Sequence, residues 1–283
     1  MSSYCRTDLA SEAHVLHERE AALTEKRGVR AREESVGGYA VTQVDILDAR
    51  GEQALGLPCG TYYTMKLDAL PHRFSPDYSG AVSALAALIR RCLPAVRPDS
   101  VLVAALGNPD VTPDALGSLA AESVLVTRHL QQEDGFQSLC SSALCRPGVL
   151  GTSGMESALQ IRSLCDSLHP GCVLVIDALA AADTASLCRC LQITNAGIAP
   201  GSGVGNNREA LNAAFLGVPV AAIGVPTVID AAFFSDLPSV SSLFVTPRDI
   251  DAAVRAFGKL IGYGVNSALN PGLSLEEMDF LLS

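Results

Sequence analysis

The sequence lacks tryptophan and is poor in aromatic and charged residues. Aromatic residues make up 5% and charged residues 18% of its 283 positions, whereas hydrophobic residues make up 48%. A core of this composition must be built from aliphatic side chains, which suits a parallel β-sheet of Val, Ile, Leu and Ala covered by helices. The length allows one large domain or two small ones.

An excess of positive charge is also missing. The formal net charge is −10, and proteins that bind nucleic acid directly usually carry a basic face. The N-terminus is polar, and no apolar run reaches the length of a membrane span. We therefore expect a cytoplasmic protein with no direct nucleic-acid partner and no membrane partner.

The cysteines follow no pattern typical of disulfides or metal sites. There are nine of them, an odd number, and their spacings do not resemble a secreted disulfide framework. A single residue separates Cys188 from Cys190, which is not a usual spacing for metal ligands. We interpret the cysteines mainly as small buried hydrophobic residues in a reducing compartment, and we expect no metal and no cofactor.

Apolar runs alternate with helical patterns along most of the chain. Strands are expected at residues 101–106, 172–176, 191–194, 218–224 and 243–246, and helices at residues 81–93, 115–130, 154–168, 182–188 and 249–263. This order predicts a doubly wound α/β fold with a mostly parallel sheet flanked by helices. Residues 39–47 and 60–67 alternate apolar and polar and predict an added N-terminal antiparallel strand pair. Residues 12–34 are charged, and we interpret them as a solvated, helix-prone segment.

The first candidate catalytic residue is Asp114. It follows the strand expected at residues 101–106, at a crossing from strand to helix where open α/β sheets place their sites. Thr112 is expected as the helix N-cap and Pro113 as the first helical residue. The positive end of the helix would then keep the Asp114 carboxylate ionised.

The second candidate is Asp177, which ends the strand expected at residues 172–176. A buried carboxylate is costly unless it has a partner. Two acids at strand ends of one open sheet can converge on one crevice, and paired carboxylates perform acid–base catalysis when their environments separate their pKa values. Asp177, closer to the apolar sheet, is the better candidate to hold a proton. The alternative is that each aspartate only caps a helix.

A glycine-rich run at residues 197–206 is a candidate rim for this crevice. Its backbone N–H groups could hold a substrate strand or polarise a carbonyl group. A nucleotide-binding loop is the weaker interpretation, because a P-loop requires Gly-Lys-Ser/Thr where this chain has Gly-Asn-Asn-Arg. Asp230 could line the crevice or cap the next turn. The substrate-binding candidates are Asn108, Gly201, Gly203, Asn206 and Asp230.

Seven ordered motifs are shared with one known family. They are Arg-Thr-Asp-Leu-Ala at residues 6–10, Gly-Asn with Val-Thr-Pro-Asp-Ala-Leu-Gly within 107–117, Thr-Arg-His-Leu at 127–130, Pro-Gly-Val with Gly-Thr-Ser-Gly-Met-Glu within 147–156, Ile-Asp-Ala-Leu-Ala-Ala at 176–181, Gly-Ile-Ala-Pro-Gly-Ser-Gly-Val-Gly-Asn at 197–206 and Ile-Gly-Val-Pro-Thr-Val-Ile-Asp at 223–230. With these motifs the chain resembles the germination proteases of spore-forming bacteria.

This resemblance implies an endopeptidase that degrades small acid-soluble spore proteins in the spore cytoplasm during germination. The family's two essential aspartates fall on Asp114 and Asp177, the residues already selected from the pattern. The resemblance also implies a fold similar to that of hydrogenase-maturation endopeptidases, and a homotetramer. Two alternatives stay open: a metal-assisted endopeptidase using the same aspartates, and a non-catalytic spore protein that serves as a binding or scaffold module.

The resemblance further implies a self-processing zymogen. In that interpretation residues 1–8 are a short propeptide-like segment, residues 9–283 form a single α/β protease domain, and the chain is cut between Asp8 and Leu9. The run Asp-Leu-Ala-Ser-Glu at residues 8–12 resembles the family's substrate signature. We expect Leu9 to fill an apolar pocket, and Asp8 and Glu12 to need positive or N–H-rich partners, for which the glycine run and Arg208 are candidates.

Overall fold

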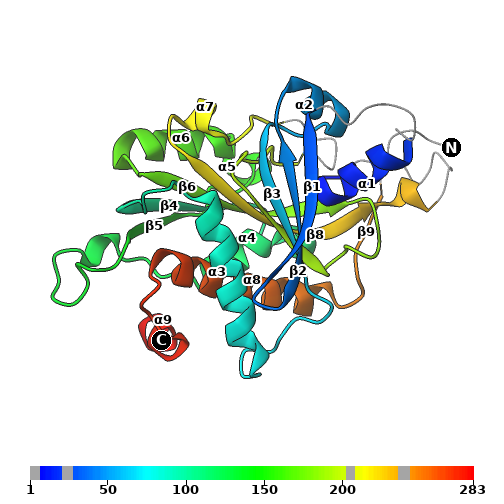
Figure 1. The fold of residues 1–283 in the computed structure, drawn as a ribbon. Coiled ribbons are helices and arrows are strands. Elements are labelled where there is room, and N and C mark those ends of the chain that lie inside the picture. Colours follow the sequence, from blue (N-terminus) through cyan, green and yellow to red (C-terminus); the bar gives the residue numbers. More distant parts are fainter. Residues whose placement is uncertain (1–6, 21–27, 202–207, 235–242) are drawn as a thin grey trace.

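The computed structural model describes residues 7–20, 28–201, 208–234 and 243–283, and these residues form a mixed β-sheet with helices on both faces (Figure 1). The strands are β1 (Val29–Val36), β2 (Tyr39–Ile46), β3 (Gly60–Lys66), β4 (Ser100–Ala105), β5 (Ser141–Cys145), β6 (Cys172–Ala181), β7 (Cys190–Thr194), β8 (Val220–Asp230) and β9 (Phe244–Val245). The helices are α1 (Ala10–Glu20), α2 (Ala49–Leu55), α3 (Asp77–Cys92), α4 (Leu116–Ala121), α5 (Leu150–Ser153), α6 (Ser157–Leu168), α7 (Ala213–Leu216), α8 (Ile250–Leu269) and α9 (Leu275–Leu282).

The strand order is β1-β2-β3-β7-β8-β6-β4-β5, and β9 pairs with β8. The pairs β8/β6, β6/β4 and β4/β5 are parallel, whereas the pairs from β1 to β8 through β7 are antiparallel. The expected α/β class with flanking helices is confirmed. The sheet is mixed rather than mostly parallel, because β3 and β7 join the antiparallel strands to the parallel group in one continuous sheet. The expected antiparallel pair is β2 and β3, and it continues on one side through β1 and on the other through β7.

Aliphatic side chains fill both sides of the sheet, as the composition predicts. Helices α3, α4 and α8 cover one face, where Leu85, Leu88, Phe257 and Ile261 are fully or almost fully buried (Figure 1). Helix α6 packs on the opposite face through Ala158 and Ile161, and α1 and α2 pack against β2 and β3. None of the described helices is long and apolar enough to cross a membrane.

Four expected elements differ from the structure because tertiary contacts override local preference. The strand expected at residues 172–176 continues as β6 to Ala181, because β8 pairs with it as far as Ile229. The helix expected at residues 182–188 is absent: these residues form turns, and the N–H of Cys188 donates to the carbonyl of Pro226. The helix expected at residues 115–130 is limited to α4, because the side chain of Asn266 on α8 bonds the backbone of Leu125 and Ser123 instead. The charged segment at residues 12–34, expected to be solvated and helical, contains most of α1 but also most of β1. Strand β1 is an edge strand that pairs with β2 along its whole length.

The register of β6 creates an unpaired edge at the centre of the sheet. Strand β4 pairs with β6 only as far as Ala105 opposite Ile176, whereas β6 continues for five more residues to Ala181. On the other side, a bulge between Leu179 and Ala180 shifts the pairing with β8. Bulges commonly re-aim side chains next to active sites. Both features coincide with the motif that contains Asp177.

Candidate active site

Asp114 and Asp177 line one cavity of about 400 Å³. The cavity lies beyond the end of β4. Its walls come from the segment after β4, from the last half of β6, from the end of β8 and from residues 200, 201 and 208. The two carboxylates therefore converge on one crevice, as predicted. The position of Asp177 differs from the prediction: it lies within β6, where β4 no longer pairs with that strand, and not at the end of the strand.

Asp114 is held in the 3₁₀ turn η1 (Thr112–Asp114) and not in the first turn of a long helix. No side chain caps this turn, so the expected capping role of Thr112 is wrong. The backbone N–H of Asn108 donates to Oδ2 of Asp114 at 2.8 Å. Burial raises the pKa of Asp114, and the Asn108 hydrogen bond and the nearby Arg208 charge oppose that rise.

Asp177 is 5% exposed and sits inside β6. Its Oδ1 accepts the N–H of Ala178 at 2.9 Å. Burial is the main cause that raises the pKa of Asp177 well above its ordinary value, and the charges of Asp114 and Asp8 raise it further. The two carboxyl groups therefore interact and lie in unequal environments, the arrangement in which one holds a proton while the other is ionised.

The chain's own N-terminal segment, residues 7–12, is docked along the free edge of β6. The N–H of Asp8 donates to the carbonyl of Ala180 at 3.0 Å, and Oδ2 of Asp8 accepts the N–H of Ala180 at 2.8 Å. Asp8 also lines the cavity of the two aspartates. The residue before the predicted cleavage position thus lies within the candidate active site.

Leu9 is completely buried, as expected for a residue that fills an apolar pocket. Its exposed fraction is 0%, and it packs in a cluster with Leu179, Ala181, Cys190 and Ile229. Leu179 comes from the edge of β6, so the wall of this pocket and the site of Asp177 belong to the same strand.

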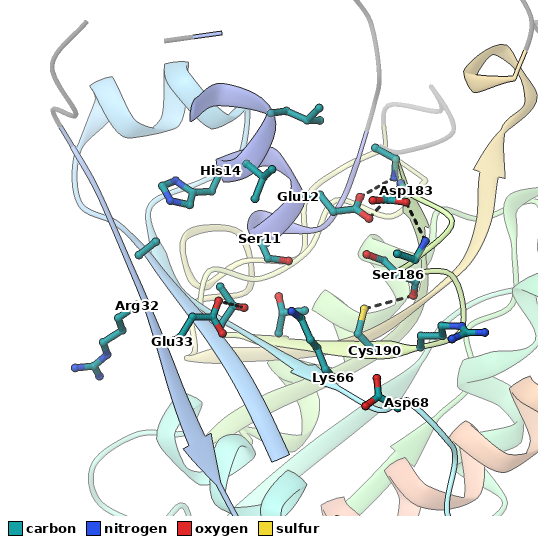
Figure 2. A pocket seen from close by; sticks show the side chains of 18 of the residues that line it. Ser11, Glu12, His14, Arg32, Glu33, Lys66, Asp68, Asp183, Ser186 and Cys190 are labelled. Atoms are coloured by element: carbon teal, nitrogen blue, oxygen red, sulfur yellow. Dashed lines mark hydrogen bonds between the residues drawn. The ribbon is translucent and has the colours of Figure 1, made fainter. Parts of the chain in front are cut away.

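The second acid of the segment, Glu12, is held by the backbone that follows β6. Its carboxylate accepts the N–H of Ala182 at 2.7 Å and that of Asp183 at 3.2 Å. Figure 2 shows Glu12 directed toward Asp183, at the border of a second cavity of about 650 Å³ that also contains Lys66, Asp68 and Ser186. Backbone amides of β6 and the following turn therefore supply N–H-rich partners for Asp8 and Glu12.

The structure also places the other candidates. Gly201 and Arg208 line the cavity. Asn108 contributes its backbone to Asp114, while its side-chain oxygen accepts the N–H of Asp110. Asp230 accepts the N–H of Ala232 and caps the next turn, and it is not among the described residues around the cavity. Gly203 and Asn206 lie outside the described residues.

Two polar residues of the site were missed from the sequence. Thr227 is the extra residue of β8 at the register shift, since Pro226 pairs with Leu179 and Val228 with Ala180. It is 1% exposed and lines the cavity, and its hydroxyl has no hydrogen-bond partner among the described residues. Gln192 on β7 is 5% exposed and contacts the docked segment. The available signal was weaker than for Asp177: each is a polar residue whose two neighbours in the strand are apolar.

A family model described as germination protease matches residues 7–238. The chain belongs to the germination protease family. It is 38% identical to the germination protease of Caldanaerobacter subterraneus subsp. tengcongensis over 98% of both chains. It is 35% identical to that of Clostridium tetani over 98% of this chain and 99% of the relative. With the germination protease of Bacillus cytotoxicus it shares 37% identity over 92% of this chain and 70% of the relative.

This membership makes the chain a protease, in agreement with the resemblance of its motifs. Among solved structures, a [NiFe] hydrogenase maturation protease, HycI, from Thermococcus kodakarensis KOD1 aligns with a TM-score of 0.36 at 16% identity, over 60% of this chain and 94% of that chain. Within the described part of the germination protease chain, no group of three or more His, Cys, Asp or Glu side chains is arranged to hold a metal ion.

Proposed function

We propose that this germination protease hydrolyses small acid-soluble spore proteins with Asp114 and Asp177, and that it is made as a zymogen that cuts itself between Asp8 and Leu9. One observation carries the proposal: the substrate-like segment of the chain is docked with Asp8 in the cavity that contains both aspartates. The family membership supports the reaction class.

In the proposed reaction, ionised Asp114 takes a proton from a water molecule while the water oxygen bonds to the carbonyl carbon of the scissile peptide. The electron pair of the carbonyl π bond moves onto its oxygen. An electron pair of that oxygen then re-forms the carbonyl π bond as the C–N bond breaks. The electron pair of the C–N bond stays on the leaving nitrogen, which takes a proton from Asp177. Transfer of the proton on Asp114 to Asp177 restores the starting state. The products are a carboxyl group and an amine. The deeper burial of Asp177 supports its assignment as the acid.

Substrate recognition in this proposal copies the docked segment. The residue before the cut lies against the free edge of β6 and donates its backbone N–H to Ala180, as Asp8 does. The residues after the cut form a helical turn, as residues 10–12 do at the start of α1. An acidic residue before the cut takes the N–H of Ala180, a large apolar residue after the cut takes the place of Leu9, and an acid four residues after the cut takes the amides that hold Glu12. These contacts support a preference for the pattern acid, large apolar, two small residues, acid.

The direct test is incubation of the purified chain with a small acid-soluble spore protein, followed by mass spectrometry of the products and of the enzyme. We expect cuts after acidic residues that precede large apolar ones, and an enzyme that begins at Leu9. Asp114→Asn and Asp177→Asn should each lower the rate by about 10²–10⁴-fold or more. Asp166→Asn is the matched control, because that side chain is 67% exposed on α6. Near wild-type turnover in either active-site variant would show that the paired-acid mechanism is wrong.

Two further expectations are kept as proposals. We propose a homotetramer, supported by the family resemblance and by a group of exposed apolar side chains near the cavity. These are Phe233, Phe234, Leu243, Phe244 and Val245, each between 39% and 54% exposed. Sedimentation of the purified chain tests it, and a monomer at micromolar concentration would contradict it. We also propose the spore cytoplasm as the location, which fluorescence imaging of a tagged chain in forespores tests.

A further inference from the structure

A buried glutamine, Gln192, bridges the two sides of the predicted cleavage position. Its Nε2 donates to the carbonyl oxygen of Asp8 at 2.8 Å, and its Oε1 accepts the N–H of Ala10 at 2.8 Å. The Asp8 carbonyl is the one that would be attacked in the proposed cut between Asp8 and Leu9. The side chain of Gln192 therefore touches the reacting carbonyl and also fixes the chain one residue beyond the leaving nitrogen.

The sheet register places Gln192 in one row with Asp177. Asp177 on β6 is opposite Gly224 on β8, and Gly224 is opposite Gln192 on β7. Residues opposite each other point to the same face, and neighbouring strands lie about 4.8 Å apart. Asp177 and Gln192 therefore stand about 10 Å apart on the same face, with a residue that has no side chain between them.

Gly224 keeps the space between these two side chains open for other groups. A Cβ atom at this position would lie 2.5 Å from Cγ of Leu179, and Leu179 forms part of the wall around Leu9. The Asp8 peptide occupies the boundary between the cavity of the aspartates and a smaller one that Gln192 lines, because Asp8 borders both. The acid pair and Gln192 thus approach the segment from different sides.

We propose that Gln192 is a catalytic residue that stabilises the oxyanion formed on the carbonyl oxygen during hydrolysis. This inference rests on the proposed function. As the π electrons of the carbonyl move onto oxygen, the Nε2–H bond strengthens, because a hydrogen bond to a charged oxygen is about twice as strong as one to a neutral oxygen. The donor is already in place and buried, so it needs no reorganisation during the reaction. Its Oε1 bond to Ala10 keeps the amide from rotating.

The test uses the full chain and a synthetic peptide of residues 6–16 as substrate. Gln192→Glu keeps the shape and the acceptor toward Ala10 but removes the donor toward the carbonyl. Gln192→Met has a similar volume, removes both bonds and avoids a buried charge, so it carries the test if the Glu variant does not fold. The matched control is Gln43→Met, because Gln43 is 6% exposed on β2 and bonds Arg32 and Asp45 instead of the docked segment.

We expect both Gln192 variants to lower kcat by about 10²–10³-fold, the loss typical of removing one oxyanion donor, whereas Gln43→Met stays within threefold. A loss confined to KM would assign Gln192 to substrate holding only and overturn the inference. The ratio of Gln192→Glu to wild-type kcat should rise as the pH is lowered, because a protonated Glu again offers an O–H donor, while the same ratio for Gln192→Met stays flat.

The outcomes separate this inference from the function on which it rests. If the wild-type chain cuts the peptide between Asp8 and Leu9 and the folded Gln192→Met variant keeps kcat within threefold, the oxyanion role is refuted and the protease function stands. If the wild-type chain cuts neither this peptide nor a small acid-soluble spore protein, the proposed function itself fails. Folding of each variant is checked by its thermal transition.

Discussion

Replacing Leu9 with alanine should release the N-terminal segment from β6. Leu9 is 0% exposed and is enclosed by Leu179, Cys190 and Ile229. Truncating a fully buried leucine to alanine costs about 2–5 kcal/mol. The backbone bonds of the segment are unchanged in this variant, so the loss falls on the free energy that holds the segment closed. At tenfold per 1.4 kcal/mol, the lower bound corresponds to about 30-fold in the opening equilibrium.

Hydrogen exchange of the Ala10 amide measures this opening, because that N–H is bonded only within the docked arrangement, to Oε1 of Gln192. The experiment is made in an Asp177→Asn background, so that self-cleavage does not remove the segment. Protection of Ala10 should fall at least about 30-fold, whereas amides in the centre of β6 stay protected.

The matched control is Leu159→Ala, the same truncation at a side chain that is 57% exposed on α6. It should leave the protection of Ala10 unchanged. Protection of Ala10 that stays within threefold of the parent in Leu9→Ala would refute the reasoning, since it would show that burial of Leu9 is not what holds the segment on β6.

Three further predictions concern the acid pair and its support. Because burial raises the pKa of Asp177 in the folded state, the folded chain binds more protons than the unfolded chain above about pH 4, so wild-type stability falls as pH rises toward the folded pKa. Asp177→Asn should remove this fall in the free energy of unfolding, which amounts to about 1.4 kcal/mol per unit of pKa difference. Denaturant unfolding of both proteins from pH 4 to 8 measures it, and the same pH dependence in the variant and the wild type would contradict the prediction. Gly107→Ala should abolish cleavage, because its Cβ would lie 1.9 Å from the carbonyl oxygen of Asp114. Gly135→Ala has a similar positive φ, +90° against +97°, but open space around it, so it should lose only about 1–2 kcal/mol of stability, and equal activities of the two variants would be inconsistent with this explanation. Activity should survive exhaustive chelation at neutral pH; loss on chelation and recovery on adding one divalent ion would instead assign the reaction to metal-assisted hydrolysis.

The sequence alone was sufficient to predict the strands that are buried on both faces, because burial makes their residues apolar. The β-rich runs that became β4, β6 and β8 are apolar because both faces of a parallel strand are covered. Asp114 and Asp177 could be selected because a carboxylate next to such runs conflicts with its surroundings. The motif resemblance and the residue pattern led to the same two positions.

The rest depended on partners that are distant in the chain. The edge strand β1 has a charged, polar sequence, and only its pairing with β2 makes it a strand. The short β5 and the terminal α9 carried no signal strong enough for a prediction. Gln192 was missed because its role depends on Asp8, which is 184 residues away in sequence. The helix dipole expected to keep Asp114 ionised is small, since the residue lies in a single 3₁₀ turn. Burial raises the pKa of Asp114, and the groups that oppose this rise are the N–H of Asn108 and the charge of Arg208.

The early end of β4 has a consequence for which polypeptides the enzyme can accept. The edge of β6 beyond Ile176 binds a visitor through the visitor's own backbone, as the Asp8 N–H bond to Ala180 shows. The interior of a helix or of an internal strand has no free backbone N–H to offer, because these groups are already bonded within that protein. A residue just before a helix does have one, as Asp8 before α1 shows. Under the proposed function a matching sequence is therefore cut where its acidic residue lies outside regular structure, and it is spared where that residue lies within a helix or an internal strand.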